Sequence, residues 1–238
     1  MKFTLRFMFH ELPVPMHFLI TAGPTREWLD PVRFISNPSS GKMGYAVACA
    51  ARDAGARVTL VSGPVELVAP RDVKVVSVET AAEMARETLK HARRADVIVL
   101  AAAVADWTPA RVARQKMKKA EGRKPKAELV LRLKPTVDIA ATLGRKRCRP
   151  GQVLVGFAAE TQRVEANARE KLRRKNLDLI VANDVSKAGA GFGVDTNEII
   201  LIDRGERMER PARASKQTLA KLIVRRALAL RAAVKEAR

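Results

Sequence analysis

The sequence predicts an α/β protein built on a mostly parallel sheet flanked by helices, ending in a β-hairpin and a helix. Short apolar runs alternate along the chain with longer segments whose apolar residues recur at helical spacing. Residues 95–102 are almost entirely apolar, which is typical of a parallel strand buried on both faces. A loop rich in glycine and serine joins the first strand to the first helix, as in many α/β units that bind anions.

The first unit spans residues 17–55. Residues 17–21 form a short apolar run that predicts a buried strand. A long polar loop follows, after which Ser39 or Ser40 is expected to cap a helix that Gly55 ends. Such a loop presents free backbone N–H groups and the positive end of a helix dipole. The unit therefore predicts an anion site, with a simple capping turn as the alternative.

Two common phosphate-binding signatures do not fit this unit. A Walker A loop needs an earlier glycine where Ser36 stands, and a serine or threonine where Met43 follows Lys42. A dinucleotide fingerprint needs three glycines directly after the strand, but the first turn contains only Gly23. The second expected strand, residues 57–61, also ends without an acid that could bind a ribose.

The remaining elements follow from the same patterns. Thr80 is expected to cap a helix over 81–94, Thr136 one over 136–143, and Ser215 a final helix that runs to about residue 235. A further helix is expected over 165–175, and a hairpin over 198–203 and 207–210. Buried strands are expected at 73–78 and 95–102, and further strands at 128–133, 153–157 and 177–182.

Composition favours one domain in the cytoplasm. The 238 residues are 47% hydrophobic, enough for a full core, so residues 16–238 are predicted to form a single domain behind a flexible extension at 1–15. Two separated cysteines and three scattered histidines predict neither a disulfide nor a metal site. No apolar run has the length of a membrane span, and no leader with a cleavage site is evident.

The net charge of +20 raises the alternative of a nucleic-acid-binding protein. The basic residues are spread along the chain and only 4% of residues are aromatic, so a nucleic-acid surface is unlikely and solvated helix faces are favoured. Residues 108–126 are a polar, lysine-rich insert, predicted to be a mobile basic flap, with a solvated loop as the alternative. Asp106 follows a central strand, where it is either a functional carboxylate or a turn residue.

An ordered set of motifs resembles the phosphopantothenate–cysteine ligase family, which joins cysteine to 4′-phosphopantothenate in coenzyme A biosynthesis. The resemblance covers roughly residues 17–235 and is specific as a set. Its motifs are Gly23-Pro24-Thr25, Asp30-Pro31-Val32-Arg33, Ile35-Ser36-Asn37, Ser39-Ser40-Gly41-Lys42-Met43-Gly44, Ala102-Ala103-Val104-Ala105-Asp106, Lys116-Met117-Lys118-Lys119, Gly156-Phe157-Ala158-Ala159-Glu160-Thr161, Lys175-Asn176-Leu177-Asp178 and Ala182-Asn183-Asp184.

The resemblance implies a Rossmann-like sheet, a homodimer and a two-step reaction. A nucleoside triphosphate, CTP in the bacterial branch, would activate the phosphopantothenate carboxylate as an acyl nucleotide and release pyrophosphate. The amine of L-cysteine would then displace the nucleoside monophosphate. Mg²⁺ would arrive with the nucleotide, and no protein metal site is expected. The family's usual decarboxylase domain is absent from the sequence, which predicts a free-standing ligase.

The resemblance also implies residue roles. Asn37 and Lys116 would be catalytic, with Lys116 on the lid. Arg33 would reach the partner subunit's site. Substrate would meet Arg33, Asn37, Ala102, Ala103 and Asp106. Nucleotide would meet Gly23, Ser39, Gly41, Gly44, Asp106, Lys116, Asp138, Ile139, Phe157, Lys171, Lys175 and Asn183.

One motif departs from the family. Its usual Asn-Pro-Asp-Ile run stands here as Thr136-Val137-Asp138-Ile139, a difference that bears on the choice of nucleotide base if this turn contacts it. An NAD(P)-dependent oxidoreductase on the same fold is the main competing interpretation, weakened by the missing fingerprint.

Overall fold

The computed structural model describes residues 15–118, 129–186 and 193–236. Its main sheet has eight strands, and the mostly parallel α/β architecture predicted from the sequence is confirmed. From edge to edge the strands are β13 (Met208–Glu209), β12 (Ile199–Asp203), β10 (Leu179–Asp184), β9 (Val153–Glu160), β6 (Val97–Leu100), β1 (His17–Ala22), β4 (Arg57–Ser62) and β5 (Lys74–Ser77). Only β12 and β13 run antiparallel to their neighbours.

The strand order reverses direction at β1. From β1 the chain adds β4 and β5 on one side, and then β6, β9 and β10 on the other. Parallel α/β sheets bind ligands outside the carboxyl ends of the two strands at such a switch point. The crevice above β1 and β6 is therefore the place where a site is expected.

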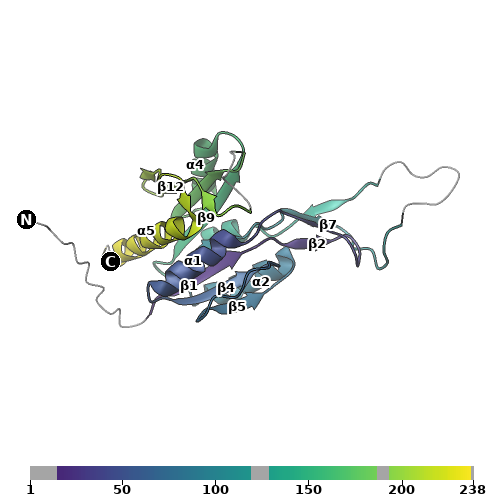
Figure 1. The fold of residues 1–238 in the computed structure, drawn as a ribbon, viewed down its shortest axis with the longest axis horizontal. Helices are drawn as coiled ribbons and strands as arrows, with labels where there is room; N and C mark the ends of the chain where they lie inside the picture. The colour runs from purple at the N-terminus through teal and green to yellow at the C-terminus, as the bar shows by residue number, and fades with distance from the viewer. Residues whose placement is uncertain (1–14, 119–128, 187–192, 237–238) are drawn as a thin grey trace, which may run out of the picture.

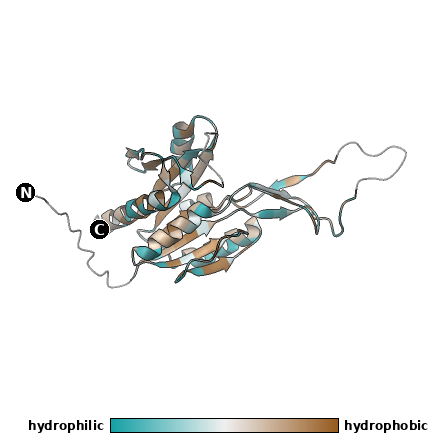
Figure 2. Ribbon diagram, viewed as in Figure 1, coloured by the Kyte–Doolittle hydropathy of each residue, from teal (hydrophilic) through white to brown (hydrophobic). Residues whose placement is uncertain are grey.

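Helices cover both faces of the sheet (Figure 1). One layer holds α1 (Lys42–Asp53) and α5 (Lys216–Glu236), and the other holds α2 (Ala81–Ala92), α3 (Ile139–Arg145) and α4 (Val164–Arg174). Alternate residues of β1 face opposite layers, because side chains alternate along a strand. Phe18 and Ile20 pack with the first layer and Leu19 with the second. Figure 2 shows apolar residues concentrated on these strands.

An arm extends from one end of the sheet (Figure 1). It consists of residues 25–36, 107–118 and 129–135. Two hairpins build it: β2 (Arg26–Trp28) pairs with β3 (Phe34–Ser36), and β7 (Trp107–Pro109) pairs with β8 (Leu133–Pro135). A further small pair, β11 (Thr196–Asn197) with β14 (Ala214–Ser215), precedes α5.

Several predicted details are wrong. Residues 129–132 form no strand, and β8 belongs to the arm instead of the main sheet, because the apolar run there lies exposed. The predicted buried strand 73–78 is β5, a partly exposed edge strand. The cap of α1 is Gly41, and neither Ser39 nor Ser40.

Of the other three predicted caps, two are correct and one is not. Thr80 forms a capping box with Glu83 at α2, and the Ser215 hydroxyl accepts from the Thr218 N–H at the start of α5. The cap of α3 is Asp138, whose carboxylate accepts from Ala141, while the Thr136 hydroxyl donates to the Ala105 carbonyl instead.

Residues 1–14 of the predicted extension, residues 119–126 of the predicted flap and the segment 187–192 lie outside the described residues. Within the described ranges, none of the helices combines the length and apolar character needed to cross a membrane.

Candidate functional site

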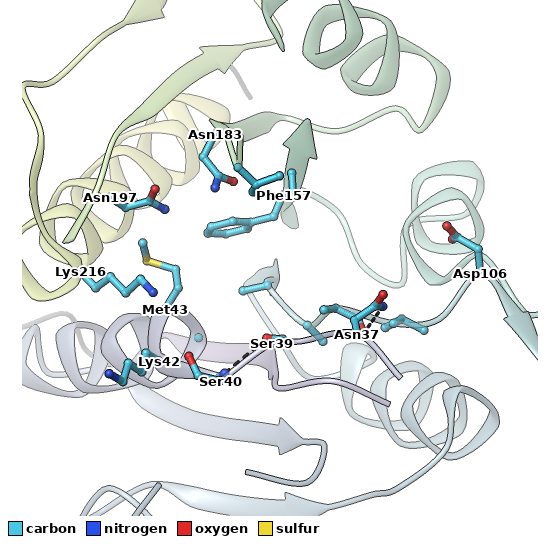
Figure 3. A pocket seen from close by; sticks show the side chains of 18 of the residues that line it. Asn37, Ser39, Ser40, Lys42, Met43, Asp106, Phe157, Asn183, Asn197 and Lys216 are labelled. Atoms are coloured by element: carbon cyan, nitrogen blue, oxygen red, sulfur yellow. Dashed lines mark hydrogen bonds between the residues drawn. The ribbon is translucent and has the colours of Figure 1, made fainter. Parts of the chain in front are cut away.

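A cavity of about 390 Å³ opens at the carboxyl ends of β1 and β6 (Figure 3). Its walls come from the loop before α1 and the first residues of that helix, the segment after β6, the ends of β9 and β10, and the start of α5. The lining residues include Asn37, Ser39, Gly41, Gly44, Ala102, Ala103, Asp106, Phe157, Lys171 and Asn183.

The start of α1 forms the floor of this cavity. Gly41 has a φ of 76°, a left-handed conformation that glycine adopts without strain. Gly44 presses against β1, because a Cβ added there would lie 2.5 Å from the Ala22 Cβ. The first N–H groups of a helix have no acceptor within it. The floor therefore offers backbone donors and a positive dipole, as the sequence predicted.

The middle of the cavity is held by hydrogen bonds between the strand ends. The Ala103 N–H donates to the Gly23 carbonyl at 2.9 Å. The Asn37 amide donates to the Ala103 carbonyl at 3.0 Å, which fixes the side chain in the cavity wall. Gly23 thus supports the site through its backbone without lining the cavity.

A second cavity of about 160 Å³ adjoins the first and shares Asp106, Phe157 and Lys171 with it. Asp138, Ile139 and Lys175 line the second cavity, and the Lys175 ammonium pairs with the Asp138 carboxylate at 3.0 Å. Burial lowers the pKa of Lys171, and the nearby Lys175 lowers it further. A cation in that position favours an anionic ligand, because an anion would compensate the burial.

Arg33 and Lys116 line neither cavity and lie on the arm. The buried Asp30 carboxylate binds the Arg33 guanidinium at 2.8 Å and accepts the Met117 N–H at 3.0 Å. Burial raises the pKa of Asp30, but these donors together with the Val32 N–H hold it well below its usual range. Asp30 therefore joins the two halves of the arm and places the backbone of Lys116 beside Arg33.

Sequence reasoning missed several residues of the first cavity. Lys42 and Met43 belong to a quoted motif but received no role, and Asn197 and Lys216 received none either. Asn197 and Lys216 lie far along the chain from the glycine- and serine-rich loop, so no local pattern links them to it. The packing of α1 against α5 brings Lys216 to the cavity, and the pairing of β11 with β14 just before α5 brings Asn197 there.

No group of three or more His, Cys, Asp or Glu side chains close enough to hold a metal ion occurs in the ranges that the structure describes. The basic residues of α4 are largely engaged in ion pairs on the surface. Arg169 and Arg173 both pair with Glu206, and Arg174 pairs with Glu170.

Residues 15–230 match the family described as the DNA/pantothenate metabolism flavoprotein C-terminal domain. The chain is 52% identical over 197 residues to the coenzyme A biosynthesis bifunctional protein CoaBC of Bacillus subtilis, covering 82% of this chain and 47% of that protein. It is 48% identical over 212 residues to a cysteine/cysteine sulfinic acid decarboxylase from an unknown prokaryotic organism, covering 89% of this chain and 57% of the relative.

The fold is similar to a solved structure of the C-terminal domain of CoaBC. The TM-score is 0.76 at 38% identity, with 93% of this chain and 96% of that domain covered. The chain spans about half the length of the curated relatives it matches. It corresponds to their C-terminal part, since that domain alone is matched almost in full.

Proposed function

The chain belongs to the family of the DNA/pantothenate metabolism flavoprotein C-terminal domain, and on that premise we propose that it is a phosphopantothenate–cysteine ligase. The observation that carries the proposal is the cavity at the strand switch point, where the free N–H groups of α1 meet the Asn37 amide and the segment after β6. Relatives named for coenzyme A biosynthesis support the proposal that 4′-phosphopantothenate and L-cysteine are the substrates and that the protein is cytoplasmic.

The proposed reaction has two steps. A carboxylate oxygen of 4′-phosphopantothenate attacks the α-phosphorus of a nucleoside triphosphate, and pyrophosphate leaves. The amine of L-cysteine then attacks the acyl carbon, an amide forms, and the nucleoside monophosphate leaves. Negative charge accumulates on the phosphates in the first step, and positioned N–H groups and ammonium groups stabilise it without a protein nucleophile.

The nucleotide is proposed to span both cavities. The triphosphate would lie on Ser39, Gly41 and Gly44 at the start of α1, and Gly23, at the end of β1, would support this wall through its backbone. The base and ribose would lie toward the second cavity, which offers Asp138, Ile139, Phe157 and Lys175, with Lys171 and Asn183 between the two parts. We expect CTP to be the preferred nucleotide, as in the bacterial branch that the motifs resemble.

The acyl substrate is proposed to lie at the end of the first cavity formed by Asn37, Ala102, Ala103 and Asp106. Mg²⁺ would arrive bound to the nucleotide. Mg²⁺ prefers oxygen ligands, and Asp106 offers a carboxylate on the wall shared by both cavities. Lys116 would reach the triphosphate from the arm during the first step.

A homodimer is proposed to complete the site, with Arg33 reaching the partner's substrate. The arm carries the argument, because it exposes large apolar side chains: Val32, Phe34, Trp107, Leu129, Val130, Leu131 and Leu133. Several large apolar side chains exposed on one structural unit are typical of an interface. A second copy of the chain is the proposed occupant, since a two-fold contact between arms would pair the same apolar patch with itself.

Pyrophosphate release tests the function directly. The protein would be mixed with 4′-phosphopantothenate and each of the four ribonucleoside triphosphates, with and without L-cysteine. We expect pyrophosphate without cysteine in a single turnover, continuous turnover only with cysteine, and the highest kcat/KM with CTP. Binding of NADPH or single-stranded DNA without any pyrophosphate release would contradict the proposal and favour one of the competing interpretations.

A further inference from the structure

Lys216 is a buried lysine at one end of the first cavity. It is the first residue of α5, and only 5% of its surface is exposed. Figure 3 shows its side chain reaching toward the start of α1, where Lys42 and Met43 lie. Lys216 belongs to the lining of the cavity.

Three features of this position disfavour a positive charge. Burial removes the ammonium from water, the start of α5 is the positive end of that helix, and Lys42 lies nearby. Burial and Lys42 together lower the pKa of Lys216, and Asp195 partly offsets them. Side chains that the surrounding structure destabilises, such as this buried lysine beside other positive charge, are expected at functional sites, where a bound ligand compensates the charge.

Asp195 links the starts of the two helices. Its carboxylate accepts the Lys42 ammonium at 2.7 Å, and its backbone carbonyl accepts the Lys216 N–H at 2.9 Å. Two positive helix ends and two lysines therefore meet at one end of the cavity, where Asp195 is already paired with Lys42. A ligand with several negative charges would compensate this arrangement.

We propose that Lys216 holds the terminal phosphates of the nucleoside triphosphate, and hence the pyrophosphate product, where α1 and α5 begin. This inference rests on the proposed function and adds a binding residue to its first step. Asn37 and Asp106 lie across the cavity from Lys216 (Figure 3). In-line displacement needs the attacking and leaving oxygens on opposite sides of phosphorus. A carboxylate held near Asn37 and a pyrophosphate held by Lys216 satisfy that requirement.

Calorimetric titration with inorganic pyrophosphate tests the assignment. The variants are Lys216→Met, Lys216→Arg and the control Lys221→Met, which removes an exposed lysine from the same helix. Because hydrogen bonds to charged groups are the stronger ones, we expect Lys216→Met to weaken pyrophosphate binding about 10- to 100-fold. Lys216→Arg should recover part of the loss, and Lys221→Met should match the wild type.

Three further ligands distinguish phosphate binding by Lys216 from other roles of this residue. CTP should lose affinity in Lys216→Met in step with pyrophosphate, whereas CMP and 4′-phosphopantothenate should bind as in the wild type. An equal loss of affinity for all ligands would show that the substitution disturbs folding. A loss of affinity for 4′-phosphopantothenate alone would show that Lys216 binds the phosphate of that substrate and not those of the nucleotide. Either result, or unchanged pyrophosphate binding, overturns the inference. Failure of the wild type to bind or use any nucleoside triphosphate would instead overturn the proposed function.

Discussion

Lys116 lies on the arm, and its neighbour Met117 is hydrogen-bonded to Asp30. A lysine that reaches the phosphates only as pyrophosphate leaves would stabilise the transition state more than the bound nucleotide. We expect Lys116→Gln to bind CTP nearly normally and to release pyrophosphate about 10²–10³-fold more slowly. Rapid-quench measurement of both steps checks this. Lys118→Gln, an exposed neighbour, is the control, and equal small effects in both variants would make Lys116 one interchangeable charge among several.

Asn37 is the neutral amide that donates to the Ala103 carbonyl at 3.0 Å. In Asn37→Asp a carboxylate replaces that donor and repels the carbonyl oxygen, which alters the wall next to the proposed acyl group. We expect the variant to form the acyl cytidylate and to pass it poorly to cysteine. Quenched-flow analysis should then show the intermediate accumulating. A complete block of pyrophosphate release would assign Asn37 to the first step instead.

His17 lies at the start of β1, where only 5% of its surface is exposed. Its ring contacts the Arg94 carbonyl at 3.2 Å and the Thr59 hydroxyl at 2.9 Å, bonds that suit a neutral imidazole. Burial lowers the pKa of His17 below the ordinary value of 6.5. The unfolded chain therefore binds a proton that the folded chain does not, and stability should fall as pH drops below about 6.5 toward the folded pKa. Urea unfolding of the wild type and His17→Gln should show a shallower pH dependence in the variant, and equal slopes would contradict this.

At the scale of elements, the contact of α1 with β1 fixes the position of the start of α1, which forms the floor of the first cavity. An alanine in a helix interior usually stabilises it by about 1 kcal/mol relative to glycine. Gly44→Ala should instead destabilise the protein by about 1–3 kcal/mol, because the new methyl group would overlap Ala22. The displaced helix start should also weaken CTP binding. Urea unfolding and nucleotide titration check both effects, and a rise in stability would show that α1 can shift freely.

At the scale of the whole molecule, the arm is the proposed dimer contact. Val130 and Val68 are both highly exposed valines, at 82% and 90%, but only Val130 lies on the arm. We expect Val130→Glu to produce monomers in sedimentation at micromolar concentration and to lose activity, because a charge would be buried in an apolar contact. Val68→Glu should remain dimeric. A fully active monomeric wild type would remove the dimer from the proposal.

Mixed dimers test whether Arg33 acts across the interface. Arg33→Ala and Lys116→Gln would each be nearly inactive alone. If Arg33 serves the partner's site, a 1:1 mixture should regain up to about one quarter of wild-type activity, because half of the dimers are mixed and one site in each is intact. No recovery would show that Arg33 and Lys116 of one chain serve the same site, and would contradict a division of the two residues between the two sites.

The sequence by itself determined the parallel sheet and the strand–loop–helix unit, because both depend on local patterns. The lining residues of the cavity that sequence analysis named were implied by the resemblance to the ligase family instead. Apolar runs predict buried strands, and Gly41 and Gly44 stand where a loop enters a helix. The prediction of an anion site needed no long-range information, because a helix start carries its donors wherever it is placed.

Tertiary structure decided the rest. The apolar run before β8 was expected to form a strand, yet it lies exposed on the arm without forming one, because pairing and burial depend on which surfaces meet and not on the run itself. Lys216 reaches the cavity only because α5 packs beside α1, across more than two-thirds of the chain. Long-range packing of this kind leaves no periodic signal, so residues brought together by it can be found only in the folded chain.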